Sequence, residues 1–187
     1  MPVNTSLAQV SDLSLRTAFA VYIVALILAC IHYMRSQAVI DLRRELKAEA
    51  KDRELIAVGD GGSTAVDGVD KQATTAADLE TARERSRKMA GAAQGLIWVA
   101  IAFHVVATVT RGLAVSRFPF GNMYEFVLSF TAIAMVVAAV IIQKKRWHTM
   151  WPWLLAPVIV LIFLDATVLY AEAAPLVPAL QSFWYPF

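Results

Sequence analysis

The sequence predicts an all-α fold: a polytopic membrane protein with four transmembrane helices and a long helical and flexible insert. Of its 187 residues, 58% are hydrophobic and only 17% are charged, which is far from the soluble average. The mean hydropathy is positive. The charges are also clustered, which leaves four stretches nearly free of them, each close to the ~20 apolar residues that cross ~30 Å of hydrocarbon.

These apolar stretches set the boundaries of the predicted segments. In chain order they are an N-terminal tail at 1–17, a first span at 18–35, the insert at 36–94, a second span at 95–115, a turn at 116–122, a third span at 123–142, a turn at 143–152, a fourth span at 153–171 and a C-terminal segment at 172–187. A cleavable signal peptide is disfavoured because further spans follow the first.

The insert combines charged helical segments with a segment of small residues. Charged pairs at helical spacing over 39–58 predict a surface helix that continues the first span. Residues 59–77 are mostly small and contain no aromatic side chain, which is typical of a flexible linker. A second charged helix over 78–89 then leads back to the membrane.

The basic residues predict the orientation. Of the seventeen lysines and arginines, eleven lie in residues 35–94 and three in the 143–148 turn. The positive-inside rule therefore predicts a cytoplasmic insert, with both termini and the 116–122 turn on the extracytoplasmic face. A net charge of +2, from bases interleaved with acids, does not indicate a nucleic-acid partner. The single cysteine excludes a disulfide and a Cys-based zinc site within the chain.

The turn between the second and third spans is unusually rich in functional side chains. Asn122 is placed to cap the third span, and Glu125 three residues later completes a capping-box pattern that also suits the positive end of the helix dipole. Capping explains neither Arg117 nor the aromatic residues around it, Phe118, Phe120 and Tyr124. A half-exposed aromatic shelf beside an arginine suits a planar, amphipathic, anionic ligand, and it equally suits lipid headgroups.

Two segments carry a family resemblance. Phe118-Pro119-Phe120-Gly121-Asn122-Met123-Tyr124-Glu125 and Leu176-Val177-Pro178-Ala179-Leu180-Gln181-Ser182-Phe183-Trp184 resemble, in this order, motifs of the CcsA/ResC-type (system II) cytochrome c biogenesis proteins, in particular the actinobacterial branch. The resemblance covers roughly residues 95–184.

The resemblance implies a multi-pass protein of the bacterial plasma membrane. Such a protein receives haem and presents it outside the cell for attachment to apocytochrome c, together with a CcsB/ResB-type partner, as part of a cytochrome c synthetase (haem lyase). It implies that the residues shaping the haem site, though not ligating the iron, are Phe118, Pro119, Asn122, Tyr124, Glu125, Gln181 and Trp184.

This chain departs from the family pattern in two places. Relatives carry a haem-ligating histidine soon after the second motif and a tryptophan-rich loop later, and both are missing here. The chain thus corresponds to an N-terminal portion, which we expect not to ligate haem as a whole family member does. Many relatives also carry histidine where this sequence has Arg117, a cation that suits a haem propionate.

Two polar residues fall deep within the predicted spans. His104 lies near the middle of the second span and Asp165 near the middle of the fourth, and ionisable residues there are functional candidates by default. Their depths differ by only about 4–5 Å at 1.5 Å rise per residue, so we predict a buried polar pair. Two other functions stay open: a non-catalytic membrane assembly subunit, and a small proton-coupled transporter that uses this pair. The sequence contains no catalytic motif and indicates no metal site.

Overall fold

The computed structural model describes residues 4–59 and 65–173, and the side chains of 4–51 and 77–173. It consists of four α-helices, α1 (Thr5–Gly59), α2 (Ala65–Val115), α3 (Met123–Lys145) and α4 (Trp151–Thr167), with a short 3-10 turn, η1 (His148–Met150), before α4. All four include an apolar segment long enough to cross a membrane, which confirms the predicted all-α fold with four candidate spans.

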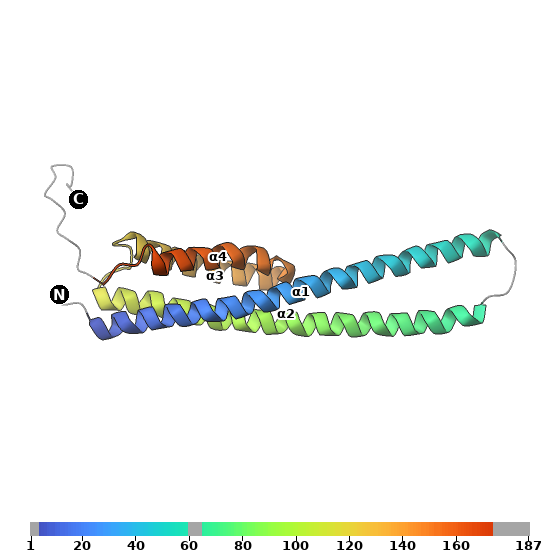
Figure 1. Ribbon diagram of the computed structural model, residues 1–187, viewed down its shortest axis with the longest axis horizontal. Helices are drawn as coiled ribbons and strands as arrows, with labels where there is room; N and C mark the ends of the chain where they lie inside the picture. Colours follow the sequence, from blue (N-terminus) through green and yellow to red (C-terminus); the bar gives the residue numbers. More distant parts are fainter. Residues whose placement is uncertain (1–3, 60–64, 174–187) are drawn as a thin grey trace, which may run out of the picture.

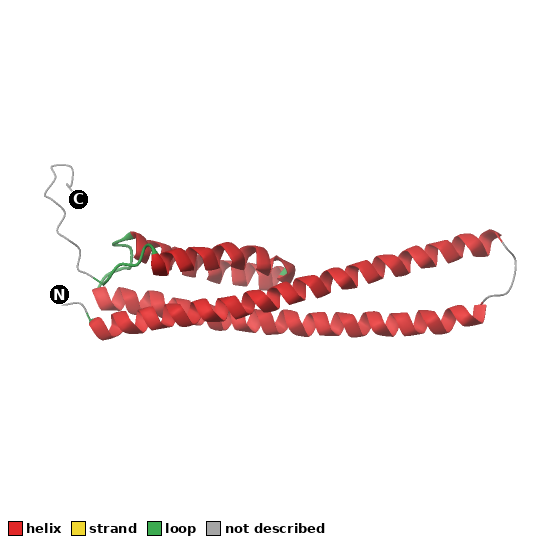
Figure 2. Cartoon of the chain, in the orientation of Figure 1, coloured by secondary structure: helices red, strands yellow, loops and turns green. Residues whose placement is uncertain are grey.

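The helices form an up-and-down bundle on part of a long hairpin (Figure 1). α1 packs on α2 and α4, and α3 packs on the same two helices. α3 and α4 cover only about half of the length of α1 and α2 (Figure 1). We call the end with residues 116–122 and the exit of α4 the turn end, where loops connect the helices (Figure 2). The hairpin end comprises residues 143–151, the stretches of α1 and α2 beside them and the parts of these two helices that extend further.

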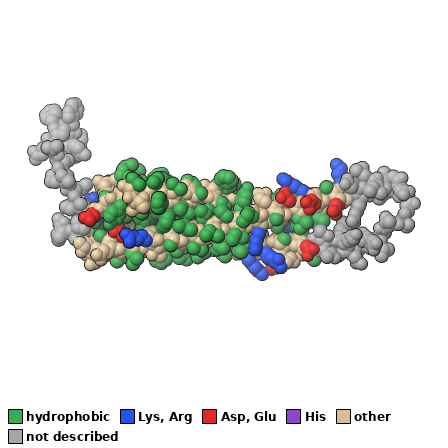
Figure 3. Space-filling view, viewed as in Figure 1, with side chains coloured by type: hydrophobic (Ala, Val, Ile, Leu, Met, Phe, Trp, Pro, Cys, Tyr) green, Lys and Arg blue, Asp and Glu red, His purple; other side chains and the backbone are tan. Residues whose placement is uncertain are grey.

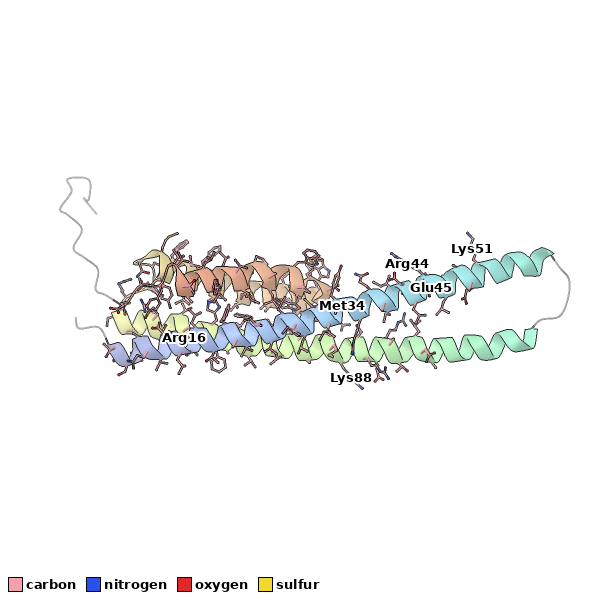
Figure 4. All side chains as sticks on the ribbon, in the orientation of Figure 1. Arg16, Met34, Arg44, Glu45, Lys51 and Lys88 are labelled. Carbon is pink, nitrogen blue, oxygen red and sulfur yellow. The ribbon has the colours of Figure 1, made fainter. Side chains whose placement is uncertain are left out.

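Side-chain chemistry divides at the same level. Apolar side chains cover the bundle, and charged side chains gather on the extended part of α1 and α2 (Figure 3). Arg44, Lys51 and Lys88 belong to that extended part and point away from the helix pair, whereas Arg16 lies on the stretch of α1 within the bundle (Figure 4).

A seven-residue pattern joins α1 to α2. The buried residues of α2 recur at alternating intervals of four and three, and several are alanines: Ser86, Ala90, Ala93, Ile97, Ala100, His104, Ala107, Arg111 and Ala114. α1 has the same spacing in Ser11, Leu15, Ala18, Tyr22, Ala25, Ala29 and His32. This is the repeat of helices that pack side by side as coiled coils, and small residues let two backbones approach closely.

The helix boundaries differ from the predicted ones in three places. α1 begins at Thr5, well before the predicted span, because Ser11 packs against α2 and its hydroxyl donates to the carbonyl of Ala107 at 2.7 Å. Most of the predicted linker over 59–77 is helical, since α2 starts at Ala65. α4 ends at Thr167, before the predicted limit of the fourth span.

α2 and α3 end in the same way. The residue after each last turn, Ser116 or Arg146, adopts the left-handed conformation with φ of 54° or 55°. The amide of Arg117 donates to the carbonyl of Gly112 at 3.2 Å, as the amide of Trp147 does to that of Ile142 at 3.0 Å. Both are Schellman caps, which reverse the chain within a few residues.

Candidate functional site

The predicted cap of α3 is confirmed, with one difference. The side chain of Asn122 accepts a hydrogen bond from the amide of Glu125 at 2.8 Å, as the sequence pattern indicates. The carboxylate of Glu125 reaches back one residue further than in a capping box and accepts from the amide of Gly121 at 2.9 Å. The turn is therefore fastened to the first turn of α3 at two points.

Two arginines converge on Glu125, whose side chain is fully buried. Arg117 Nη1 donates to Glu125 Oε2 at 2.7 Å and Arg117 Nη2 lies 3.4 Å from Glu125 Oε1. Arg111 Nε approaches Glu125 Oε1 at 3.5 Å from the other side, and its own side chain is 0% exposed. The Arg117 contact is a charge-assisted hydrogen bond, which is strong where water is excluded. The Arg111 contact is an ion pair without a hydrogen bond.

The two terminal nitrogens of the Arg117 guanidinium hold the turn. Besides its contacts with Glu125, the guanidinium donates to the carbonyl of Phe118 at 3.2 Å. It also packs so closely over Gly121 that a Cβ atom at that position would collide with it. The arginine predicted to meet a ligand thus acts as an internal fastening of the turn.

Arg111 extends the network to the other two helices. Its Nη1 lies 3.8 Å from Asp12 Oδ1 on α1, and its Nη2 donates to the carbonyl of Ala171, just after α4. Its guanidinium carbon stacks 4.8 Å from the centre of the Tyr124 ring, a cation–π contact. We call Asp12, Arg111, Arg117, Tyr124 and Glu125 the buried ion network.

Sequence reasoning missed two members of this network. No motif in the sequence points to Arg111 or to Asp12. Asp12 has two partners in the structure, because it lies 3.8 Å from Arg111 and also accepts from the hydroxyl of Tyr170 at 2.8 Å. This hydrogen bond and burial raise the pKa of Tyr170. The seven-residue pattern would have found Arg111, since it occupies a core position in line with Ala107 and Ala114.

An apolar groove of about 770 Å³ opens on the other side of the turn. Its lining residues come from α2, the turn and α3: Thr108, Val109, Gly112, Leu113, Ser116, Arg117, Phe118, Pro119, Phe120, Ser129 and Ile133. Phe118 is 84% exposed at its edge. The hydroxyl of Ser129 donates to the carbonyl of Pro119 at 3.1 Å and ties the turn to α3.

The structure separates the predicted site residues into two groups. Phe118 and Pro119 line the groove. Tyr124, predicted for the exposed aromatic shelf, is instead buried in the ion network because it faces Arg111 and Tyr170. Asn122 and Glu125 stabilise the turn by hydrogen bonds that join it to the first turn of α3. Gln181, Trp184 and the rest of the second motif lie outside the described residues.

His104 and Asp165 are both buried, but the ring of His104 faces other partners. Its Nδ1 lies 3.5 Å from the Tyr22 hydroxyl and its Nε2 lies 3.4 Å from the Thr131 hydroxyl. Asp165 lies within electrostatic range of Arg111, at the edge of the ion network. Its Oδ1 has no hydrogen-bond partner among the described residues.

The hairpin end contains a different set of polar contacts. The indole of Trp98 donates to Gln143 at 3.0 Å and that of Trp151 donates to Gln94 at 2.8 Å, so that neutral side chains join α2 to α3 and α4. Trp151 itself is only 1% exposed. His32 and Ser86 join α1 to α2.

Comparisons with protein-family models, curated proteins and solved structures find no match for this chain. Among the described side chains, those of residues 4–51 and 77–173, no cluster of three or more histidine, cysteine, aspartate or glutamate residues has the arrangement of a metal site. The described part of the site is thus a rigid turn with an apolar groove beside it and buried charges behind it.

Proposed function

We propose that this chain forms part of the wall of an extracytoplasmic haem site in a cytochrome c maturation system of the bacterial plasma membrane. The observation that carries the proposal is the apolar groove beneath Phe118 and Pro119. Its volume and mostly apolar lining suit a large apolar ligand such as a porphyrin, and ligand pockets are typically concave and mostly apolar with few polar groups. The groove lies at the motif that resembles the CcsA/ResC-type proteins.

The groove supplies packing and no iron ligand, because its lining residues include no histidine, cysteine or methionine. In this function the iron ligands come from sequence or a partner beyond the described residues, such as a CcsB/ResB-type protein, and the acceptor is apocytochrome c. The residues described here orient the porphyrin and exclude water from one of its faces.

The distribution of bases supports an extracytoplasmic groove. The hairpin end carries most of the lysines and arginines, and the positive-inside rule assigns such an end to the cytoplasm. The groove lies at the opposite end of the bundle. Both termini are then extracytoplasmic. Labelling of single cysteines at Phe118 and Lys145 with a membrane-impermeant maleimide, in a Cys30→Ala background, tests this: only the first reacts in intact cells.

Haem titration of the full chain in nanodiscs tests the groove. Val109→Trp fills the groove, and Val160→Trp is a matched control because both valines are more than half exposed and Val160 lies outside the lining. We expect haem binding to the native chain to shift the Soret band. The haem affinity should fall about tenfold in Val109→Trp and stay at the native value in Val160→Trp. Equal haem binding by both variants contradicts the proposal.

A non-catalytic assembly subunit is the second candidate. It is favoured by the lack of an iron ligand in the groove lining, and it predicts no Soret shift in any variant. The transporter alternative rested on a relay between His104 and Asp165, whereas the contacts of His104 run to Tyr22 and Thr131.

A further inference from the structure

Arg111 is an arginine with no exposed surface, placed where two separate parts of the turn end meet. A buried guanidinium is costly unless its charge is paired, so its contacts indicate what holds it there. Arg16, an arginine on the neighbouring helix α1, is exposed instead. The burial of Arg111 is therefore specific to its position in the core pattern of α2.

The first part that Arg111 contacts is the base of the turn. Its Nε lies 3.5 Å from Oε1 of Glu125. The other oxygen of this carboxylate, Oε2, accepts hydrogen bonds from Arg117 and from the amide of Gly121. Any shift of the turn that moves Glu125 changes this ion pair. Rigid contacts between charged groups are a physical means of transmitting such a shift.

The second part is the exit of α4. Arg111 Nη2 donates to the carbonyl of Ala171, and the neighbouring Tyr170 hydroxyl donates to Asp12, itself 3.8 Å from Arg111 Nη1. One guanidinium thus holds the exit of α4 directly and through Asp12. The turn and this exit are over forty residues apart in sequence and share Arg111 as a common partner.

We infer that Arg111 is a positioning residue that couples the turn at 116–122 to the exit of α4. Displacing or neutralising the carboxylate of Glu125 then loosens the contact between Arg111 and the carbonyl of Ala171. This coupling goes beyond the proposed function. It holds whether or not the groove takes a porphyrin, and its test uses no haem.

The test measures how often the exit of α4 opens. The full chain carries Cys30→Ala and Ala171→Cys, which leaves the backbone carbonyl of residue 171 in place. The rate of modification by a maleimide then reports local opening. We expect Arg111→Lys, which keeps the charge and loses the fork of the guanidinium, to raise the rate about tenfold.

The decisive variant is Glu125→Gln, which removes the charge facing Arg111 and makes no contact with Ala171 itself. We expect it to raise the rate as well, and to add little in combination with Arg111→Lys because the two residues act through one contact. Ser129→Ala is the matched control: it removes the hydrogen bond that ties Pro119 of the same turn to α3 and leaves the Arg111–Glu125 contact, so the rate stays at the native value.

A native rate in Glu125→Gln overturns the coupling, even if Arg111→Lys speeds labelling, because Arg111 then anchors only α4. Equal acceleration by Ser129→Ala overturns it too, since any loosening of the turn would then suffice. If Arg111→Lys does not accumulate in the membrane, the comparison of Glu125→Gln with Ser129→Ala decides alone.

Discussion

The two ends of the bundle are held together by different kinds of polar contact. At the turn end, Glu125 and Arg111 are fully buried and pair with each other, and Glu125 also pairs with Arg117. At the hairpin end, buried contacts between helices are neutral, and ion pairs such as Lys88–Glu84 are formed by side chains that are 77% and 72% exposed. The same helices α1 and α2 supply both ends.

The difference shows where charge has a structural function. Exposed pairs one helical turn apart contribute little because water screens them and the side chains lose entropy. Buried charges carry a large desolvation cost, and a packed apolar contact is often as stable. A buried ion network at one end therefore indicates a requirement for a fixed geometry there, and the turn beside the groove is what it fixes.

The largest difference in stability between the two ends should come from removing the carboxylate of Glu125, which Arg111 and Arg117 share. Glu125→Ala leaves Arg111 without its buried partner, and we expect it to lower the free energy of unfolding by about 3–5 kcal/mol. Glu84→Ala at the hairpin end, the matched control, should change it by less than about 0.5 kcal/mol. Thermal unfolding in detergent measures both. Similar losses in the two variants would show that the ends do not differ as described.

Two glycines offer a comparison without charge. Gly121→Ala places a Cβ against the Arg117 guanidinium, and we expect overpacking to cost about 2 kcal/mol. Gly91→Ala on α2 meets no atom within 4 Å, and we expect a gain of up to about 1 kcal/mol from helix propensity. Chemical denaturation of the purified variants gives both values. A neutral Gly121→Ala would mean that the turn is looser than its contacts indicate.

The hydrogen bonds of the hairpin end should differ with burial. Gln94→Leu removes the acceptor of the buried Trp151 indole, and we expect a loss of about 1.5 kcal/mol. Gln143→Leu removes the acceptor of Trp98 at a more exposed contact, where water replaces it and the loss should stay below about 0.5 kcal/mol. Indole fluorescence during unfolding follows the two contacts, and the reverse order would contradict this assignment.

The smallest effect concerns the rim of the network and depends on pH. The pKa of Tyr170 is raised because the protonated hydroxyl donates to Asp12 and because it is partly buried. A raised pKa means that this stabilisation is complete below about pH 10, the unfolded value, and is lost as the pH rises through the folded pKa. Tyr170→Phe should thus destabilise the native chain by about 0.5 kcal/mol near pH 8, after allowance for solvent screening.

Thermal unfolding of both chains between pH 8 and about pH 11 tests this sign. The difference between them should shrink at the alkaline end, and a difference that grows there would contradict the hydrogen bond.

Local patterns in the sequence predicted the framework of the molecule. The four apolar stretches and the Asn122 cap depend on neighbouring residues, so composition and spacing suffice to predict them. The burial of Tyr124 and the contacts of Asp12 depend on helices far apart in the chain, and no local pattern predicts them. Arg111 lies between these cases, because the seven-residue spacing of α2 marks it as a core residue while its partners on other helices follow from no local pattern.

The central claim is that buried charges hold the 116–122 turn in one conformation. Hydrogen–deuterium exchange of the turn amides in lipid nanodiscs tests it most directly, with Glu125→Gln and Glu84→Gln compared to the native chain. We predict slow exchange of the Gly121 amide in the native chain and in Glu84→Gln, and fast exchange in Glu125→Gln. Fast exchange in the native chain, or continued protection in Glu125→Gln, would contradict the claim.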